Sequence, residues 1–393
     1  MSSIAAPGAA TSARHNGLSI AILAVAAFVI VTTEYLMVGL LPALARDLEI
    51  SISAAGQLVT LFAFTVMLFG PALTALLSHL ERKRLFIAIL LVFAASNVLA
   101  AIAPNIWVLA VARFIPALAL PVFWGTASET AGQIVGEQRA GRAVSQVYLG
   151  ISAALLFGIP LGTLASDAIG WRGTFWVLAA LSLAMALALT IFMPTVAMPR
   201  RLRLAEQASI LRNPYFVGNV ALSVVVFTAM FTAYTYLADM LERIAGVAPA
   251  YVGWWLMGFG AIGLVGNWLG GHLVDRSPLG STAVFSVLLG VGMAASVPLS
   301  GSLPMLGAAL AFWGIAYTAL FPICQVRVMK SASHAQALAG TLNVSAANAG
   351  TGLGAIIGGL VIPYWGLASL GYVATGIAIL AALSAVLISC MRR

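Results

Sequence analysis

Twelve runs of mainly apolar residues, each about as long as a membrane-spanning helix, follow one another along this chain. They fall at residues 18–42, 52–77, 85–103, 106–131, 141–166, 172–193, 214–238, 249–272, 281–301, 303–327, 336–363 and 366–390. A helix rises 1.5 Å per residue, so about 20 apolar residues cross the roughly 30 Å hydrocarbon core of a bilayer. The sequence therefore predicts an all-α membrane protein with twelve transmembrane helices.

The composition agrees with a polytopic membrane protein, since 62% of residues are hydrophobic and only 8% are charged. A formal net charge of +8 is also compatible with a nucleic-acid-binding protein. The positions of the cations along the chain decide between that class and a membrane protein. With a cytoplasmic N-terminus, fifteen Lys and Arg residues fall in inner segments, with Arg327 counted there. Only Arg46, Arg172 and Arg243 fall outside, and Arg113 lies within a span. The positive-inside rule then predicts that both termini are cytoplasmic, and no nucleic-acid partner is needed.

The longest polar break, residues 194–213, divides six spans from six. It contains prolines and the sequence Arg200-Arg201-Leu202-Arg203, which favours a linker with a short interfacial amphipathic helix. The predicted organisation is a disordered N-terminus (1–16), a six-helix bundle (17–193), the linker (194–213) and a second bundle (214–393).

Two pairs of motifs recur at an offset of a little under 200 residues, as a duplicated unit predicts: Gly170-Trp171-Arg172 with Tyr364-Trp365-Gly366, and Gly158-Ile159-Pro160-Leu161-Gly162 with Gly350-Thr351-Gly352-Leu353-Gly354.

Glu34 is a carboxylate inside the first apolar run. Near the middle of a bilayer an acidic side chain costs about 2.5 to 3.5 kcal/mol, so it is normally found facing a polar cavity or a partner. We interpret Glu34 as the proton-binding site of a transporter. The alternative is a carboxylate that braces helices through hydrogen bonds.

Arg113 is a second charge within a span and cannot lose its proton to escape the cost of burial. Counted along their helices, Arg113 and Glu34 lie at similar depth. Trp124, three helical turns after Arg113, shares its helix face, whereas Glu129 points nearly opposite.

Several stretches resemble the major facilitator superfamily, in its drug:proton antiporter branch and closest to the bacterial sugar efflux (arabinose efflux permease) group. They are Thr33-Glu34-Tyr35-Leu36-Met37-Val38-Gly39-Leu40-Leu41, Phe123-Trp124-Gly125-Thr126, Gly158-Ile159-Pro160-Leu161-Gly162-Thr163 and Gly170-Trp171-Arg172-Gly173-Thr174-Phe175. The resemblance implies two six-helix bundles around a central cavity, alternating access and transport of a small molecule. It places the helices of Glu34 and Arg113 together on the cavity, where the two charges could meet directly or through water. We therefore expect Arg113 to keep the proton affinity of Glu34 in a working range, so that proton and substrate compete.

The superfamily's loop signature is degraded between the second and third spans, where Ser78 replaces its aspartate. By resemblance, Arg82 could pair with Glu129 to hold the outward-open state; the alternative is an ordinary cytoplasmic cation and a solvated helix end. The second copy of the signature keeps Asp275 and Arg276. These four residues are our gating candidates in the loops.

The fifth span contains Gly158 and Pro160, and looks like the antiporter signature. Small residues permit close helix approach and proline bends a span, so a hinge between the bundles is one interpretation. Close packing without motion is the other.

Substrate contacts are predicted from aromatic and polar residues on the cavity helices. Phe227, Phe231 and Tyr234 follow helical spacing with threonines beside them, which suits a sugar or another small amphipathic molecule. Packing between helices is the simpler explanation for aromatic residues at this spacing. The predicted contacts are Tyr35, Trp124, Phe227, Phe231, Tyr234 and Asn348, with Asn267, Trp313, Tyr317 and Gln325 as weaker candidates.

These features together predict a proton-coupled exporter in the bacterial inner membrane, working as a monomer among membrane lipids. Broad drug efflux and nucleoside or purine export remain open, as does an uncoupled facilitator or channel. We expect no enzyme activity, because no His, Asp or Cys cluster lies near one membrane face. No nucleotide-binding loop or metal-ligand spacing indicates a cofactor, and Cys324 and Cys390 are expected to be buried thiols.

Overall fold

The computed structural model describes residues 7–77, 80–135, 140–195, 211–274, 276–332 and 336–391, with some side chains inside these ranges left out. The described chain is helical almost throughout. Its elements are α1 (Pro7–Asp47), α2 (Ile52–Leu77), α3 (Arg82–Ala101), α4 (Ile106–Val135), α5 (Ala140–Ala153), a π-helical turn (Ala154–Gly158), α6 (Ile159–Phe192), α8 (Pro214–Tyr234), α9 (Leu237–Arg243), α10 (Pro249–Leu273), α11 (Pro278–Ser296), α12 (Leu303–Lys330), α13 (Gln336–Trp365), a 3-10 turn (Leu367–Ser369) and α14 (Leu370–Met391).

Eleven stretches of the described chain are long and apolar enough to cross a membrane, which confirms a multi-pass membrane protein. The longest, Leu149–Phe192, has 44 residues and would measure about 66 Å as one straight helix, twice a bilayer core. It is broken at Gly170, whose φ of 73° and ψ of 159° are not helical. Only glycine adopts this backbone conformation readily.

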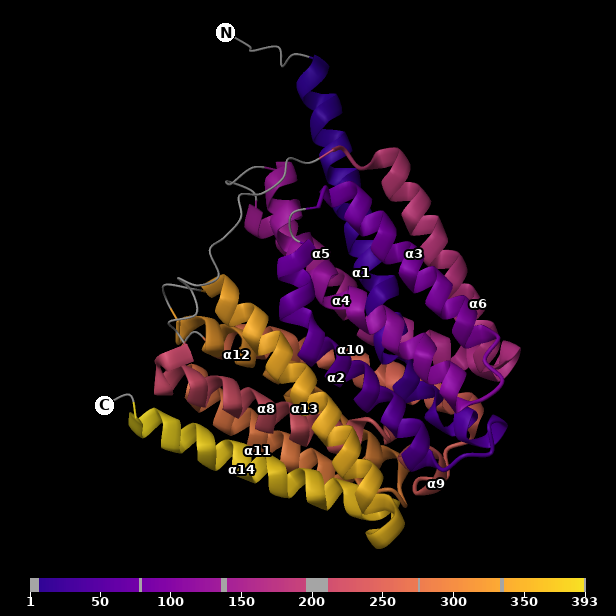
Figure 1. The fold of residues 1–393 in the computed structure, drawn as a ribbon. Helices are drawn as coiled ribbons and strands as arrows, with labels where there is room; N and C mark the ends of the chain where they lie inside the picture. The colour runs from indigo at the N-terminus through magenta and orange to yellow at the C-terminus, as the bar shows by residue number, and fades with distance from the viewer. Residues whose placement is uncertain are drawn as a thin grey trace.

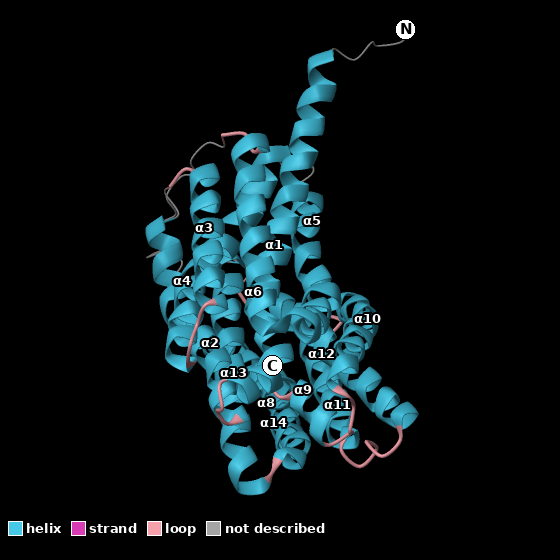
Figure 2. Ribbon diagram, turned by 90° about the vertical axis from the view of Figure 1, so that its right-hand side faces the viewer, coloured by secondary structure: helices cyan, strands magenta, loops and turns pink. Residues whose placement is uncertain are grey.

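The first and second parts of the chain gather on different sides of the molecule. Figure 1 shows the indigo to magenta helices on one side and the orange to yellow helices on the other, and Figure 2 shows the same helices from a second direction. One large core cluster consists almost entirely of residues from α8 to α14, whereas two others come almost entirely from α1 to α6. Each part therefore buries its own apolar surface.

The two parts repeat each other in local conformation. Gly170 has φ 73° and ψ 159°, and Gly366 has φ 82° and ψ 161°, each just before the last long helical stretch of its part. A Cβ on Gly158 would meet Thr32 of α1, and a Cβ on Gly354 would meet the backbone of Thr232 of α8. Both motifs thus pack against the first helix of their own part, although the sequence pairing placed Gly350, not Gly354, opposite Gly158.

The two parts meet at the end of the molecule where α1 ends and α9 lies. A mixed core cluster at this end joins residues of α1 and α2, such as Leu41 and Ile52, to residues of the second part, such as Met240 and Val361. Arg46 donates to Glu242 at 2.6 Å, and the Tyr236 hydroxyl donates to the Ala355 carbonyl at 2.8 Å. We call this the closed end. At the other end the start of α1 and the end of α14 lie far apart (Figure 1).

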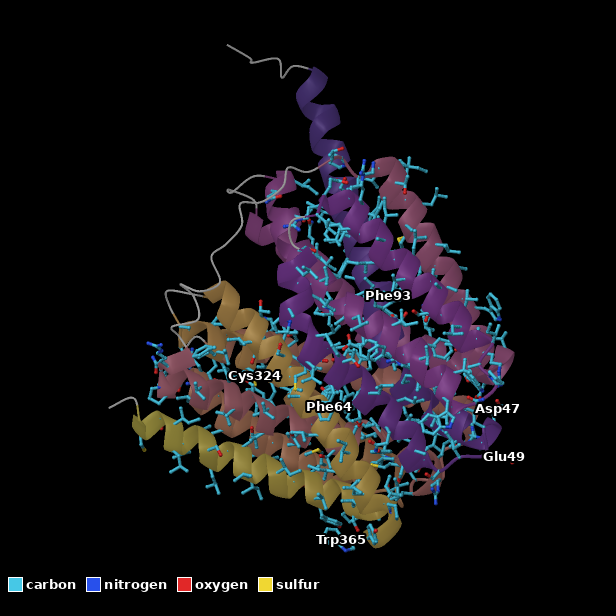
Figure 3. All side chains as sticks on the ribbon, viewed as in Figure 1. Asp47, Glu49, Phe64, Phe93, Cys324 and Trp365 are labelled. Carbon is cyan, nitrogen blue, oxygen red and sulfur yellow. The ribbon has the colours of Figure 1, made fainter. Side chains whose placement is uncertain are left out.

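The closed end also holds polar contacts of the first part. Asp47, labelled in Figure 3, accepts hydrogen bonds from Arg172 and from the Trp171 indole, the latter at 3.0 Å. Arg172 also donates to the Ala103 carbonyl at 3.0 Å and stacks over the Trp171 ring. The motif after Gly170 therefore ties the start of the last helical stretch to the ends of α1 and α3.

Two expectations about single residues are wrong. Cys390 is exposed on α14 rather than buried, because it lies on the outward face of a helix at the edge of the molecule, whereas Cys324 is buried as expected (Figure 3). Arg327 is not a loop cation: it lies in α12 and is 2% exposed. The amphipathic helix expected in the linker falls mainly on residues 196–210, which lie outside the described residues.

Candidate functional site

Glu34 lies in α1 at the level where the two parts of the chain touch. Its side chain is half-buried, while Thr32 and Thr33 beside it are buried. The next residue, Tyr35, stacks on Phe231 of α8 with ring centroids 5.9 Å apart. The sequence-predicted proton site therefore faces aromatic residues of the second part.

Arg113 reaches α1 from α4 and is 1% exposed. Its two terminal nitrogens donate to the main-chain oxygens of Thr33 at 2.6 Å and Glu34 at 2.7 Å. Its guanidinium also lies 4.3 Å from the ring centroid of Phe62 in α2. The proximity to Glu34 was predicted, but the terminal nitrogens bond the backbone rather than the carboxylate. Arg113 is thus placed to hold the segment of α1 that carries Glu34.

Two neighbours of this segment were missed by sequence reasoning. Asn97 of α3 donates to the Thr33 hydroxyl at 3.3 Å, and that hydroxyl donates to the Val29 carbonyl at 2.9 Å. Phe62 supplies the face against which the Arg113 guanidinium lies, a cation–π contact. Asn97 could have been noticed as a polar residue inside an apolar run. Nothing in the sequence singles out Phe62 among the chain's phenylalanines.

An aromatic cluster lies beside Glu34 on the second part of the chain. Tyr234 and Tyr317 have ring centroids 4.5 Å apart, and each lies within 6 Å of Phe231. Phe259 of α10 extends the cluster, 5.6 Å from Tyr234 and 5.7 Å from Tyr317. The structure thus brings together Tyr35, Phe231, Tyr234 and the weaker candidate Tyr317. The buried Tyr317 hydroxyl has no hydrogen-bond partner within the described residues.

The other predicted contact residues differ in how they relate to this cluster. Trp313, a weaker candidate, packs edge-on against Phe259 with ring centroids 5.7 Å apart. Trp124 packs edge-on against Phe123 at 5.3 Å and lies about 16 Å along α4 from Arg113. Phe227 packs against Phe321 at 5.2 Å, and Phe321 in turn packs against Tyr317 at 5.5 Å, so Phe227 is joined to the cluster through one ring. Asn348 donates to Val344 of its own helix at 3.0 Å.

The loop residues predicted to gate transport are only partly described. Asp275 and the side chain of Glu129 lie outside the described residues, so the pair with Arg82 stays a prediction. Arg82 itself is fully buried, unlike a solvated loop cation, and Arg276 is exposed. Glu81, which sequence reasoning passed over, caps α3 by accepting from the backbone N–H groups of Lys83 and Arg84 at 2.9 and 3.0 Å.

Gly158 and Pro160 lie where the π-helical turn passes into α6. A π-helical turn inside a helix is a local irregularity of the kind often found at functional sites. Gly158 packs against Thr32, two residues before Glu34, and Gly260 of α10 packs against the Leu155 carbonyl of the same turn. The turn therefore contacts both α1 and the second part of the chain.

We expect Gly158→Val to destabilise the protein by about 1 to 3 kcal/mol, because the added side chain overlaps Thr32 in a packed contact. The melting temperature in detergent measures this effect. Gly376→Val on α14 is the matched control, since its Cβ meets nothing within 4 Å. Equal melting temperatures for the two variants would show that α1 and the turn separate freely.

A buried polar network surrounds Arg327 in the second part. Its terminal nitrogens donate to Thr282 at 2.8 Å, to Ser223 at 2.7 Å and to the Asn219 carbonyl at 3.1 Å. Ser223 donates in turn to the Asn343 side chain at 2.7 Å. One guanidinium therefore links α8, α11 and α12, and through Ser223 also α13. Sequence reasoning missed it because Arg327 lies near a predicted helix end.

Comparison with known proteins identifies the family. The family model described as Major Facilitator Superfamily matches residues 23–345. The chain belongs to the major facilitator superfamily. It is 36% identical over 352 residues to the inner membrane transport protein YdhP of Escherichia coli strain K12, covering 89% of each chain, and equally similar to YdhP of strain O157:H7 over 350 residues. These findings confirm a multi-pass inner-membrane transporter.

Solved structures of the superfamily share the fold at low identity. A bacterial homologue of the human lysosomal transporter Spinster, in an inward-facing conformation, gives a TM-score of 0.77 at 15% identity and covers 96% of each chain. The nucleoside transporter NupG gives 0.77 at 14%, covering 95% of this chain and 99% of NupG. A D-xylose-proton symporter gives 0.74 at 16%, covering 93% and 96%. At these identities the likeness concerns the fold alone.

Proposed function

We propose that this transporter exports a small molecule in exchange for protons, with Glu34 as the proton-binding group. The observation that carries the proposal is the position of Glu34: a half-buried carboxylate within a spanning helix, beside aromatic rings of the other half of the chain. A charged carboxylate in this setting is costly, and protonation removes that cost. Loading and release of a proton would therefore change how well the two halves pack at Tyr35 and Phe231.

Arg113 acts in this proposal as a positioning residue. By donating to the carbonyls of Thr33 and Glu34 it fixes the backbone of the proton site without neutralising the carboxylate through a direct hydrogen bond. Glu34 then remains able to bind a proton, and a substrate that needs the ionised carboxylate as its hydrogen-bond acceptor competes with that proton. Such competition is what antiport requires.

We further propose twelve spans in two six-helix bundles, with Gly170 separating two crossings and both termini in the cytoplasm. The closed end then faces the periplasm and the structure is inward-facing. Alternating access requires the contacts at this end, including that of Arg46 with Glu242, to open during transport.

Cross-linking the closed end should stop transport. We expect Arg46→Cys combined with Glu242→Cys to lose most activity after treatment with a short bis-methanethiosulfonate, which joins the two cysteines through disulfides, and to recover it when those disulfides are reduced. The variant with Arg46→Cys alone controls for single-site labelling. Full activity of the cross-linked protein, verified by mass, would contradict opening at this end.

For the substrate we propose a sugar or sugar-like compound, with nucleosides and lipophilic cations as alternatives. Aromatic faces that carry the Tyr35, Tyr234 and Tyr317 hydroxyls can stack on a sugar ring and exchange hydrogen bonds with it. Export, rather than import, rests on the resemblance to the antiporter branch.

Counterflow in proteoliposomes tests the substrate class without needing a proton gradient. We expect exchange of at least one sugar and a strong loss of that exchange in Tyr317→Phe, which removes only the unpartnered hydroxyl. Exchange of a nucleoside or a lipophilic cation alone would replace the sugar assignment. No exchange of any compound by a folded protein would contradict the transporter proposed here.

A further inference from the structure

An apolar groove lies on the surface of the second half, between α10 and the start of α12. It has a volume of about 270 Å³, close to the lower end of the roughly 300 to 1,000 Å³ typical of small-molecule sites. Every residue that lines it is apolar or aromatic: Trp254, Trp255, Gly258, Phe259, Ile262, Gly307 and Leu310. The groove therefore suits a hydrocarbon ligand.

The groove lies between the outward-facing sides of two membrane-spanning helices, α10 and α12. On α10, Tyr251, Trp254 and Trp268 are 62%, 58% and 61% exposed. On α12, Met305 and Phe312 are 56% and 57% exposed. Both helices are long and apolar enough to span the membrane, so these faces meet lipid rather than water.

We propose that this groove binds one acyl chain of a membrane phospholipid. Its lining on α10 runs from Trp254 to Ile262, which is about 12 Å along the helix axis. Tyr251, one turn nearer the helix start, is the kind of amphipathic aromatic residue that sits at the headgroup level of a bilayer. A phospholipid with its headgroup beside Tyr251 would thus send one chain along the groove toward the membrane centre.

Two glycines leave the space that the chain fills. A Cβ on Gly258 would meet nothing within 4 Å, and a Cβ on Gly307 would meet only Trp255, at 3.9 Å. Other glycines of the same helices, such as Gly260 and Gly266, are instead pressed against backbone of the neighbouring helix. Gly258 and Gly307 therefore leave the groove open, and neither is needed for close packing between helices.

The groove also touches the machinery of the proposed transport cycle. Its wall residue Phe259 lies 5.7 Å from Tyr317 in the aromatic cluster. The opposite face of α10 packs on the first half, where Gly253 lies against Leu164. An acyl chain in the groove supports α10 from the outside and so stabilises the helix that joins the aromatic cluster to the interface between the halves.

Native mass spectrometry tests the site. Wild type, Gly307→Leu and Gly376→Leu are purified in mild detergent, delipidated, and given phosphatidylethanolamine and phosphatidylglycerol in turn. Leucine at position 307 fills the groove, whereas position 376 is an exposed glycine of α14 with open space around it. We expect the Gly307→Leu protein to retain one phospholipid fewer than the other two. If the Gly307→Leu protein does not fold, Gly258→Leu replaces it in the experiment.

Equal lipid counts in all three proteins would overturn the proposal. So would displacement of the bound phospholipid by a transported compound at saturating concentration, because the groove would then belong to the substrate. Persistence of the lipid in the presence of that compound, together with its loss in the filled variant, supports a dedicated lipid site. Neither result depends on whether Glu34 couples protons, so failure here is distinguishable from failure of the proposed function.

Discussion

Replacing Glu34 with Gln should abolish transport driven by a pH gradient while leaving substrate binding and counterflow in place. Glutamine keeps the size of the side chain and its hydrogen bonds but cannot bind or release a proton. We expect the gradient-driven rate to fall by about 100-fold or more, since coupling has no other carboxylate at this contact among the described residues. Proteoliposomes with an imposed gradient, compared with counterflow in the same vesicles, measure the two activities.

Glu49→Gln is the matched control for that experiment. Glu49 is an exposed carboxylate in the loop after α1, near the closed end (Figure 3). The same chemical change there should leave both activities intact. Gradient-driven transport at the wild-type rate in the Glu34→Gln protein would remove Glu34 from the coupling mechanism and make it a structural brace.

Removing Arg113 should have the largest effect on stability. Arg113→Ala loses two hydrogen bonds to buried carbonyls at 2.6 and 2.7 Å, together with the contact to Phe62. Hydrogen bonds from a charged group contribute about 1.5 to 3 kcal/mol each, so we expect a loss of about 3 kcal/mol or more. Lysine should restore little, because a single ammonium cannot serve both carbonyls and lie flat on the ring. Thermal unfolding in detergent measures the change.

Arg84→Ala gives the comparison for Arg113. The Arg84 side chain is 91% exposed and pairs with Glu81 at 3.8 Å, so its loss should cost less than about 1 kcal/mol. If Arg113→Ala unfolds at the same temperature as Arg84→Ala, the carbonyls of Thr33 and Glu34 do not depend on the guanidinium, and the positioning role fails.

The membrane-spanning architecture could be predicted from the sequence because it follows from run length and hydropathy alone. The repeat could be recognised from the two pairs of motifs, but its register could not. Gly170 and Gly366 share a positive φ, whereas the motif pairing placed Gly170 opposite Tyr364. The depth of Glu34 and Arg113 followed from counting residues along helices. These features depend on local sequence, so they can be predicted without knowing how the helices pack.

The partners of the buried charges could not be predicted. Arg113 bonds main-chain oxygens, and Arg327 bonds hydroxyls and a carbonyl on other helices, so neither contact has a sequence signature. The position of Trp124 relative to the aromatic cluster depends on how the helices pack, and helical spacing on α4 gives no distance to α8.

Substrate-triggered proton movement would show whether Glu34 couples transport to protons. Purified protein in vesicles loaded with a pH-sensitive dye would be challenged with sugars, nucleosides and lipophilic cations, beside its Glu34→Gln variant. We expect at least one compound to move protons opposite to its own direction, and the signal to vanish in the variant. Counterflow of a compound without any proton movement in the wild type would contradict antiport and leave an uncoupled facilitator.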